Sequence, residues 1–423
     1  MNLNKNKIAI IGLGYVGLPL AAEFAKQYKV VGFDIDAQRI DELKKGTERT
    51  KEIESEQLKK ALKKGLYLSS DPQSISDSNI YIVTVPTPIN DEKEPDLSHL
   101  LTASKLIARH LQKDDVVIYE STVYPGCTEE DCVPVLENIS GLKYNKDFFC
   151  GYSPERISPG DKHNTLTKII KVTSGSNKAT ALKVDELYTS IIKAGTYMAP
   201  SIKIAEASKS IENAQRDLNI SFMNELAVIF DKMDIDTNDV LEAAKTKWNF
   251  LPFKPGLVGG HCISVDPYYL TYKSEKLGYK PDVILSGRNV NDKMGRFVAK
   301  KIERLMTDKD IEIAGANVLI LGVTFKENCP DIRNTKVIDV YEELVSLGAN
   351  VEVFDSVANK QEVKKELSID LITDYNKNKY TAIVLAVAHD DFKSIDFNAL
   401  KHEKTVIFDA KSFLPANYID GRL

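Results

Sequence analysis

Short apolar runs alternate with helical segments in the first part of the chain. The runs lie at 7–11, 30–33, 80–85 and 116–120, and each leads into a glycine, an acid or a polar loop. Apolar runs of this length are typical of strands buried on both faces of a parallel sheet. The segment after Ile11, up to about Tyr28, has helical periodicity instead. The pattern predicts an α/β domain with a doubly wound sheet.

A second set of apolar runs stands near the C-terminus, at 317–323, 351–354, 382–387 and 406–408, and alternates with helical segments such as 335–347. Between the sets, from about Ile202 to Met233, the apolar period is helical and no proline interrupts it. We therefore expect two Rossmann-like doubly wound domains joined by a central helical region that contains a long helix. The expected domains are 1–200, 201–305 and 306–423. Because one small core cannot cover so long a helix, we expect at least a homodimer.

The first apolar run leads directly into Gly12-Leu13-Gly14-Tyr15-Val16-Gly17. In this context the first glycine permits the turn, the second lets the backbone approach a pyrophosphate and the third lets helix and strand pack closely. The run 30–33 ends at Asp34, where an acid hydrogen-bonds ribose hydroxyls and repels a 2′-phosphate. Arg39 stands close by and could cover the adenine. The sequence therefore predicts a site for NAD in preference to NADP.

Polar loops follow the later strands of this domain. They are Pro86-Thr87-Pro88 and Ser121-Thr122-Val123-Tyr124-Pro125-Gly126. Since parallel strands bind ligands at their carboxyl ends, we expect Pro86, Thr87 and Thr122 beside the cofactor. Helix capping is the alternative role for Thr122. A further loop, Ser153-Pro154-Glu155-Arg156, holds either a surface ion pair or a carboxylate that orients water or a substrate hydroxyl.

A cysteine lies in the turn Gly259-Gly260-His261-Cys262-Ile263-Ser264-Val265-Asp266-Pro267. A thiolate is nucleophilic, and a helix start or a nearby cation lowers the pKa of a thiol. We expect a helix to begin near Ser264, with Cys262 at its positive end and Asp266 about one turn further on. The alternative is a small, buried and inert cysteine.

Cationic side chains that could contact a ligand stand at two further places. On the long helix, Lys209 and Asn213 are four positions apart, so both side chains point the same way. Such residues are usually solvated, and their role depends on what faces them. Phe325-Lys326-Glu327 and Asp331-Ile332-Arg333 follow the apolar run 317–323. Cations at this edge of a doubly wound sheet indicate a second, nucleotide-like ligand.

Composition narrows the function classes. The 423 residues are 43% hydrophobic and 28% charged, as in soluble globular proteins. A net charge of -5 gives no general attraction to nucleic acid. There is no run of 18 apolar residues that would predict a membrane span. The five cysteines include no CxxC pair, so we expect neither disulfides nor a metal site, and a reducing cytoplasm.

The motifs form an ordered set: GLGYVGLP, VPTP, STVYPG, SPER, K-x-x-x-N, GGHC-x-x-x-D and FK-x-x-x-x-D-x-R. This set resembles the UDP-glucose/GDP-mannose dehydrogenase family over essentially the whole chain. The segments 212–219 and 247–267 look like the bacterial branch that oxidises UDP-N-acetylhexosamines. The resemblance implies a four-electron oxidation of a sugar C6 alcohol to a carboxylate with two NAD per turnover. The pathways it implies are capsule or O-antigen synthesis.

By that resemblance, Cys262 captures the C6 aldehyde as a thiohemiacetal, and a second hydride transfer gives a thioester that water cleaves. Lys209 and Asn213 would stabilise the oxyanions. This fits the chemistry, because an aldehyde must become tetrahedral before it gives up a second hydride, and each oxyanion needs preorganised donors. The other residues implied in catalysis, which would orient or activate water, are Asp266, Thr122 and Glu155.

The resemblance also implies ligand contacts. Lys326 would meet the nucleotide sugar, and Arg333 would reach NAD. The remaining residues implied at the substrate are Glu155, Arg156, Lys209, Asn213, Phe253, Gly256, Gly259, Arg288 and Phe325.

Several alternatives stay open at this point. The sugar is N-acetylglucosamine or N-acetylgalactosamine, with UDP-glucose, UDP-N-acetylmannosamine and GDP-mannose as rivals. A two-electron oxidation of a small hydroxy acid would need no Cys262. A non-catalytic NAD-binding sensor or scaffold would have no use for a thiol, a lysine and a carboxylate arranged for covalent catalysis.

Overall fold

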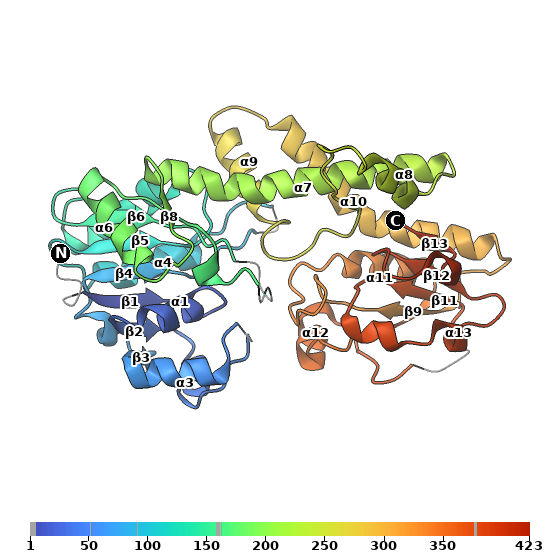
Figure 1. Ribbon diagram of the computed structural model, residues 1–423, viewed down its shortest axis with the longest axis horizontal. Helices are drawn as coiled ribbons and strands as arrows, with labels where there is room; N and C mark the ends of the chain where they lie inside the picture. Colours follow the sequence, from blue (N-terminus) through green and yellow to red (C-terminus); the bar gives the residue numbers. More distant parts are fainter. Residues whose placement is uncertain (1–5, 51, 91, 158–160, 162, 376–378) are drawn as a thin grey trace. The chain divides into compact units, whose positions relative to one another are not determined.

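The computed structural model describes residues 6–50, 52–90, 92–157, 161, 163–375 and 379–423. The chain forms two compact units, each with its own parallel sheet (Figure 1). The first unit runs to Glu212 and also contains Tyr268–Tyr279, and the second comprises Asn213–Pro267 and Lys280–Leu423. Among the described helices, none is both long and apolar enough to cross a membrane.

The first unit is built on a six-stranded parallel sheet with the order β3-β2-β1-β4-β5-β6. Its strands are β1 (Lys7–Ile11), β2 (Lys29–Phe33), β3 (Leu66–Ser69), β4 (Ile80–Val83), β5 (Val116–Tyr119) and β6 (Phe149–Tyr152). Ile8 of β1 pairs with Val30 on one side and with Ile80 on the other. The strand order reverses between β1 and β4, which is where a doubly wound sheet binds a dinucleotide.

The helices of this unit are α1 (Gly17–Phe24), α2 (Ala37–Lys44), α3 (Ser55–Lys64), α4 (Ser98–Ala108), α5 (Val133–Ser140) and α6 (Lys178–Thr189). Ile8 and Ile10 of β1 share one buried apolar cluster with Leu18 of α1, Leu58 of α3 and Leu187 of α6. A separate parallel pair consists of β7 (Lys171–Thr173) and β8 (Thr196–Met198). Short 3₁₀ or π turns lie at Pro72–Ile75, Thr128–Cys132 and Leu166–Lys168.

The second unit contains a five-stranded parallel sheet with the order β10-β9-β11-β12-β13. Its strands are β9 (Asn317–Leu321), β10 (Asn350–Phe354), β11 (Ala382–Leu385), β12 (Val406–Asp409) and β13 (Gly421–Arg422). Its sheet-covering helices are α11 (Val337–Ser346), α12 (Lys360–Leu367) and α13 (Phe397–Leu400), with 3₁₀ turns at Asp390–Ser394 and Ala416–Tyr418. The order reverses between β9 and β11, which makes a second switch point.

Four helices lie between the two sheets in sequence: α7 (Ile202–Lys232), α8 (Thr237–Ala244), α9 (Asp266–Lys276) and α10 (Asp282–Thr307). The long helix that the sequence predicts is therefore α7, and the chain passes from the first unit to the second within it. The prediction of two Rossmann-like sheets with a long central helix is confirmed.

Some predicted boundaries are wrong. The helix expected near Ser264 begins at Asp266, because the backbone first makes a turn in which the amide of Asp266 donates to the carbonyl of Cys262 at 2.8 Å. The segment 286–289 lies inside α10. A Cβ at Gly287 would lie 2.6 Å from Leu218, so the glycine lets α10 approach α7 closely. The runs 80–85, 116–120 and 317–323 leave their sheets one or two residues early, where the ligand-side loops begin.

The turn after the first strand of each sheet has the same construction. Gly12 and Gly322 both have positive φ, +96° and +91°. The amide of Gly12 donates to the carbonyl of Phe33 at 2.8 Å, and that of Gly322 donates to Phe354 at 2.8 Å. Asp34 accepts a backbone amide in the first turn, and Asp355 does so in the second, each at 2.7 Å. The two sheets therefore present equivalent backbone turns at their switch points.

Gly322→Ala should lower the melting temperature by several degrees more than Gly315→Ala. Both glycines have positive φ (+91° and +76°), so both substitutions carry a backbone cost of about 1 kcal/mol. A Cβ at 322 would lie 2.5 Å from Val387, whereas at 315 it would meet no described atom within 4 Å. Overpacking adds about 1–3 kcal/mol. Thermal unfolding of both variants tests this, and equal shifts would contradict it.

Candidate active site

The glycine turn after β1 is open on one side. A Cβ on Gly17 would lie 1.8 Å from the carbonyl oxygen of Gly12, so only glycine fits there. A Cβ on Gly14 would meet no described atom within 4 Å. Thr84 fixes the turn from β4, because its Oγ1 donates to the carbonyls of Ile11 and Gly12 at 3.1 and 2.7 Å. The open side at Gly14 lets a pyrophosphate approach the backbone. Tyr15 and Val16, both half-buried, follow directly.

Asp34 anchors the same turn. Its Oδ2 accepts the amide of Leu13 at 2.7 Å, and its Oδ1 accepts the amide of Asp36 at 3.0 Å. An ionised carboxylate has about four acceptor positions, so these two bonds leave acceptors for ribose hydroxyls. The carboxylate is thus oriented before any ligand arrives.

Arg39 is buried beside this turn. Its Nε and Nη2 donate to the carbonyl of Leu13 at 3.4 and 3.3 Å, and Nη2 also bonds Glu48 at 2.6 Å. Its Nη1 is buried with no hydrogen-bond partner among the residues that the structure describes. A buried orphan donor fits a ligand acceptor that completes it. The role of Arg39 over the adenine stays a prediction.

The loops after β4 and β5 are tied together. Thr87 Oγ1 donates to the carbonyl of Thr122 at 2.8 Å, and Ser121 Oγ donates to the carbonyl of Val85 at 2.6 Å. Tyr269, from α9, donates its hydroxyl to the carbonyl of Thr87 at 2.9 Å. The structure therefore brings Pro86, Thr87 and Thr122 to one edge of the first sheet, where parallel strands bind ligands.

Glu155 lies in a buried ion-pair network. Its Oε1 accepts the amides of Arg156 and Ile157 at 2.6 and 2.7 Å, and its Oε2 bonds Lys171 Nζ at 3.1 Å. Lys171 also bonds Glu120 at 2.7 Å. Burial by itself lowers the pKa of Lys171, but the two carboxylates outweigh it and raise that pKa. The side chain of Arg156 points elsewhere, to Glu212 at 2.8 Å.

Lys209 is buried on α7 and has no hydrogen bond or ion pair within the described part of the chain. A buried ammonium without a partner is costly, so a lysine in this state is suited to meet an anion. Lys209 belongs to the first unit, while Asn213, one helical turn later, begins the second.

The half-buried Cys262 lies in a tightly held turn of the second unit. Its carbonyl accepts the amides of Val265 and Asp266 at 3.2 and 2.8 Å. Ser264 Oγ donates to the carbonyl of Gly260 at 2.5 Å. The predicted pair Asn213 and Asp266 is brought together, since Asn213 Nδ2 donates to Asp266 Oδ2 at 2.5 Å. Cys262 and Asp266 thus share one rigid segment.

The two glycines before Cys262 are packed against the loop that follows β9. A Cβ on Gly259 would lie 2.6 Å from the carbonyl oxygen of Asn334, and one on Gly260 would lie 2.6 Å from the ring of Phe325. Three positions upstream of Gly259, Gly256 exchanges two backbone hydrogen bonds with the amide group of Asn224, at 2.8 and 3.0 Å. The structure therefore gathers three predicted substrate residues, Gly256, Gly259 and Phe325, around one segment.

The remaining predicted substrate and cofactor residues are Arg288, Arg333, Lys326 and Phe253. Arg288 is buried and pairs with Asp217 and Asp292, each at 2.6 Å. Arg333 pairs with Asp331 at 2.5 Å. Lys326 and Phe253 are half-buried. Their contacts with ligands stay predictions.

Sequence reasoning missed the buried polar residues that hold the predicted ones. They are Glu48, Glu120, Lys171, Asp217 and Asn224. The sequence analysis gave them no role, because their partners lie between 9 and 71 positions away along the chain and are met only through the packing of the fold.

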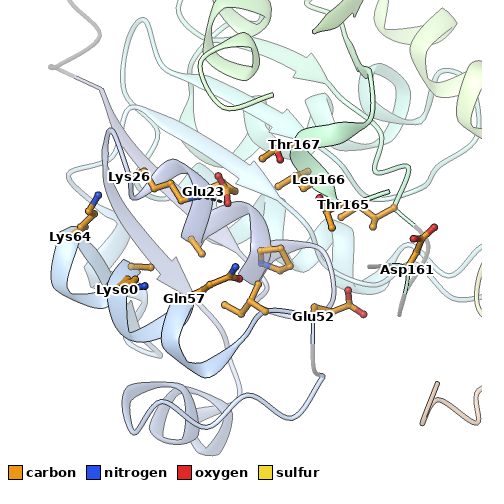
Figure 2. Close-up of a pocket in the computed structure, with 15 residues that line it drawn as sticks. Glu23, Lys26, Glu52, Gln57, Lys60, Lys64, Asp161, Thr165, Leu166 and Thr167 are labelled. Carbon is orange, nitrogen blue, oxygen red and sulfur yellow. Dashed lines mark hydrogen bonds and ion pairs between the residues drawn. The ribbon is translucent and has the colours of Figure 1, made fainter. Parts of the chain in front are cut away.

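A surface pocket of about 390 Å³ is lined in part by Glu52 and Ile157, whose backbone amides bond Glu48 and Glu155. It is lined by α1, α3 and parts of the loop before β7, and none of the predicted site residues lines it. Lys60 and Lys64 lie at one end of it and Asp161 at the other (Figure 2).

Three family models match the chain: the NAD binding domain of the UDP-glucose/GDP-mannose dehydrogenase family at residues 6–192, its central domain at 203–293 and its UDP binding domain at 319–416. The UDP-N-acetyl-D-glucosamine 6-dehydrogenase of Salmonella typhi is 53% identical over 100% of this chain and 99% of that protein. The chain belongs to the UDP-glucose/GDP-mannose dehydrogenase family.

Further relatives agree. The UDP-N-acetyl-D-glucosamine 6-dehydrogenase of Pseudomonas aeruginosa is 53% identical to this dehydrogenase over 99% of each chain. The solved structure of the UDP-D-ManNAc dehydrogenase from Pyrococcus horikoshii has a TM-score of 0.88 at 29% identity and covers 98% of each chain. The predictions of a nucleotide-sugar dehydrogenase and of NAD as its cofactor are confirmed.

The residues of the first switch point fit this cofactor. The open backbone at Gly14, the oriented carboxylate of Asp34 and the orphan donor of Arg39 offer a dinucleotide three kinds of contact. In the dehydrogenase, NAD held there would supply the hydride acceptor.

Gly14→Ala should weaken NADH binding about tenfold or more and leave the melting temperature unchanged, because its Cβ would meet only the space that the pyrophosphate needs. Gly17→Ala is the matched variant and should lower the melting temperature, since its Cβ would lie 1.8 Å from a carbonyl oxygen. NADH fluorescence titration and thermal unfolding separate the two effects. Unchanged NADH affinity in Gly14→Ala would rule out the close approach.

Proposed function

We propose that this dehydrogenase oxidises the C6 hydroxyl of a UDP-N-acetylhexosamine, UDP-N-acetylglucosamine or UDP-N-acetylgalactosamine, to a carboxylate. The observation that carries the proposal is the 53% identity, over essentially full length, to two proteins named UDP-N-acetyl-D-glucosamine 6-dehydrogenase. The uronic acid would enter capsule or O-antigen polysaccharide. Each turnover consumes two NAD, because alcohol to carboxylate is a four-electron oxidation.

Cys262 makes the second oxidation possible. Its thiolate adds to the carbon of the C6 aldehyde, and the carbonyl electrons move to oxygen to give a thiohemiacetal alkoxide. Loss of the C6 hydride to the second NAD restores the carbonyl and leaves a thioester on Sγ. Water then adds to that carbonyl, and the thiolate leaves as the carboxylate forms. The covalent bond to Sγ keeps the aldehyde on the protein between the two oxidations.

Lys209 and Asn213 stabilise the oxyanions of these steps. The burial of Lys209 without a described partner supports this role, since an ammonium in such a state gains most from an incoming negative charge. Asn213 already donates one amide hydrogen to Asp266, and an amide nitrogen carries two, so one hydrogen remains for an oxyanion.

Asp266 and Thr122 act on the hydrolytic water. The bond from Asn213 at 2.5 Å fixes the Asp266 carboxylate in place. Glu155 supports water placement from a fixed position, because two backbone amides and Lys171 hold its carboxylate. A carboxylate held this way keeps its direction through the reaction.

The UDP portion binds at the second switch point, after β9, where the family's UDP binding domain matches. Lys326 meets the nucleotide sugar, and Arg333 reaches NAD. The other proposed substrate contacts are Arg156, Phe253, Gly256, Gly259, Arg288 and Phe325. UDP-glucose, UDP-N-acetylmannosamine and GDP-mannose remain the alternative substrates. Membership of a dehydrogenase family argues against the sensor or scaffold.

We also propose a homodimer formed along α7, in the cytoplasm, with the domain division 1–200, 201–305 and 306–423. Four large apolar side chains on α7 are exposed: Ile204, Ile211, Phe222 and Ile229. Their offsets of 7, 18 and 25 positions from Ile204 place all four within about 20° of one another on one helix face. An exposed apolar stripe of this kind favours association with a second copy.

Limiting UDP-N-acetylglucosamine should yield two NADH per molecule, with UDP-N-acetylgalactosamine and UDP-glucose measured in parallel. Cys262→Ala should abolish the second oxidation, because nothing then holds the aldehyde as a tetrahedral adduct. NADH absorbance at completion gives the ratio. One NADH per sugar, or full activity in Cys262→Ala, would eliminate the covalent route, and turnover of UDP-glucose alone would eliminate the N-acetylated sugar.

Phe222→Glu and Ile229→Glu together should shift the mass in sedimentation from twice 47.2 kDa to 47.2 kDa, because each places a charge in the apolar stripe. Arg216→Glu is the control. Arg216 is exposed on α7 but lies about 120° from the stripe, so its variant should stay dimeric. A parent protein that sediments as a monomer would overturn the dimer.

A further inference from the structure

Two residues at the first switch point favour opposite cofactors. Asp34, at the end of β2, disfavours a 2′-phosphate, whereas an arginine close to the ribose is what NADP-binding sheets use to accommodate that phosphate. Arg39 lies against the same glycine turn as Asp34 and is a candidate for this role. It donates to the carbonyl of Leu13, and Asp34 accepts the amide of the same residue at 2.7 Å. The carboxylate of Asp34 therefore bonds the amide of Leu13, and the guanidinium of Arg39 bonds its carbonyl.

Glu48 decides what Arg39 offers to a ligand. The two side chains form an ion pair at 2.6 Å and are only 3% and 1% exposed. Glu48 lies on the loop after α2 and receives three more hydrogen bonds: from the amide and hydroxyl of Thr50 at 2.9 and 2.7 Å, and from the amide of Glu52 at 3.1 Å. The carboxylate that faces Arg39 is thus fixed in place.

This carboxylate is charged at neutral pH. Burial alone would raise the pKa of Glu48, but the hydrogen bonds from Arg39 and Thr50 outweigh burial and lower it. The other arginine nearby, Arg49, is exposed and pairs with Asp36 at 3.0 Å and Glu42 at 3.7 Å. The buried guanidinium of Arg39 is therefore neutralised by Glu48, and Arg49 carries its own partners.

We propose that Glu48 sets the preference for NAD over NADP by neutralising Arg39 and holding it against the glycine turn. With Glu48 in place, a 2′-phosphate meets Asp34 without a compensating cation. With Glu48 uncharged, Arg39 offers its full positive charge to that phosphate. Interactions in a partly buried site are several-fold stronger than in water, so one charge near a doubly charged phosphate changes affinity about tenfold or more.

The test measures dissociation constants for NADH and NADPH by nicotinamide fluorescence, which needs no sugar substrate. Glu48→Gln keeps the shape and the acceptor oxygen but removes the charge. It should improve the affinity for NADPH relative to NADH about tenfold. Glu42→Gln is the matched control, because it removes a carboxylate that pairs with the exposed Arg49, and its ratio should stay within about twofold.

Two further variants make the result specific. Adding Arg39→Met to Glu48→Gln should remove the gain in NADPH affinity, because the cation is then gone. Thr50→Val keeps both charges but removes the hydroxyl that orients Glu48 at 2.7 Å, and should give a smaller shift in the same direction. Thr50→Val also keeps the proposal testable if Glu48→Gln fails to fold.

An unchanged NADPH-to-NADH ratio in Glu48→Gln and Thr50→Val would overturn the proposal. So would an equal loss of both cofactors, which indicates a merely structural role for Glu48. Because NAD use belongs to the family, the role of Glu48 does not depend on which sugar is oxidised. If the sugar assay fails but the NADPH-to-NADH ratio shifts, the proposed substrate is wrong and the role of Glu48 stands. If the sugar is oxidised but the ratio does not shift, the role of Glu48 is wrong and the substrate stands.

Discussion

In each sheet, the turn after the first strand is held by a hydrogen bond from its backbone to an aspartate carboxylate, and the ligand edge of the sheet depends on this bond. Asp34 accepts the amide of Leu13 and Asp355 accepts the amide of Val323, each at 2.7 Å. Each bond holds open a turn whose glycine has positive φ, and each turn lies where the strand order reverses. The same kind of turn therefore shapes the ligand-binding edge of both sheets. The family's NAD binding and UDP binding domains match these two edges.

Buried ion pairs in this dehydrogenase orient polar groups more than they stabilise the fold. Removing charges from water costs several kcal/mol per ion, so a buried pair contributes little net stability. Three such ion pairs link Lys171 to Glu155, Glu48 to Arg39, and Asp217 to Arg288. In each case a buried partner, to which the sequence analysis gave no role, fixes the direction of a predicted site residue. Direction matters here because hydride transfer and thioester hydrolysis need groups that do not reorganise during the step.

The segment that carries Cys262 is also held in a fixed position, but by backbone packing and backbone hydrogen bonds in place of ion pairs. Gly259 and Gly260 leave no room for a Cβ against Asn334 and Phe325, and Asp266 closes the turn through its amide. The bond from Asn213 to Asp266 joins this segment to α7. A nucleophile on a segment held at several points can add to a carbonyl and leave again without losing its position. The proposed covalent route demands this, since the same sulfur would act once as nucleophile and once as leaving group.

The sequence by itself determined the two doubly wound sheets, the long helix α7 and the glycine turn with Asp34, because apolar periodicity and turn chemistry are local properties. Motifs of fixed spacing also predict Cys262, Lys209 and Asn213 as site residues. Only the tertiary structure decided which side chains these residues meet. Glu48 bonds Arg39, Lys171 bonds Glu155 and Asn224 bonds Gly256, although the partners are 9, 16 and 32 positions apart in the sequence. Such partners are set by how strands and helices pack, and no local pattern records that packing.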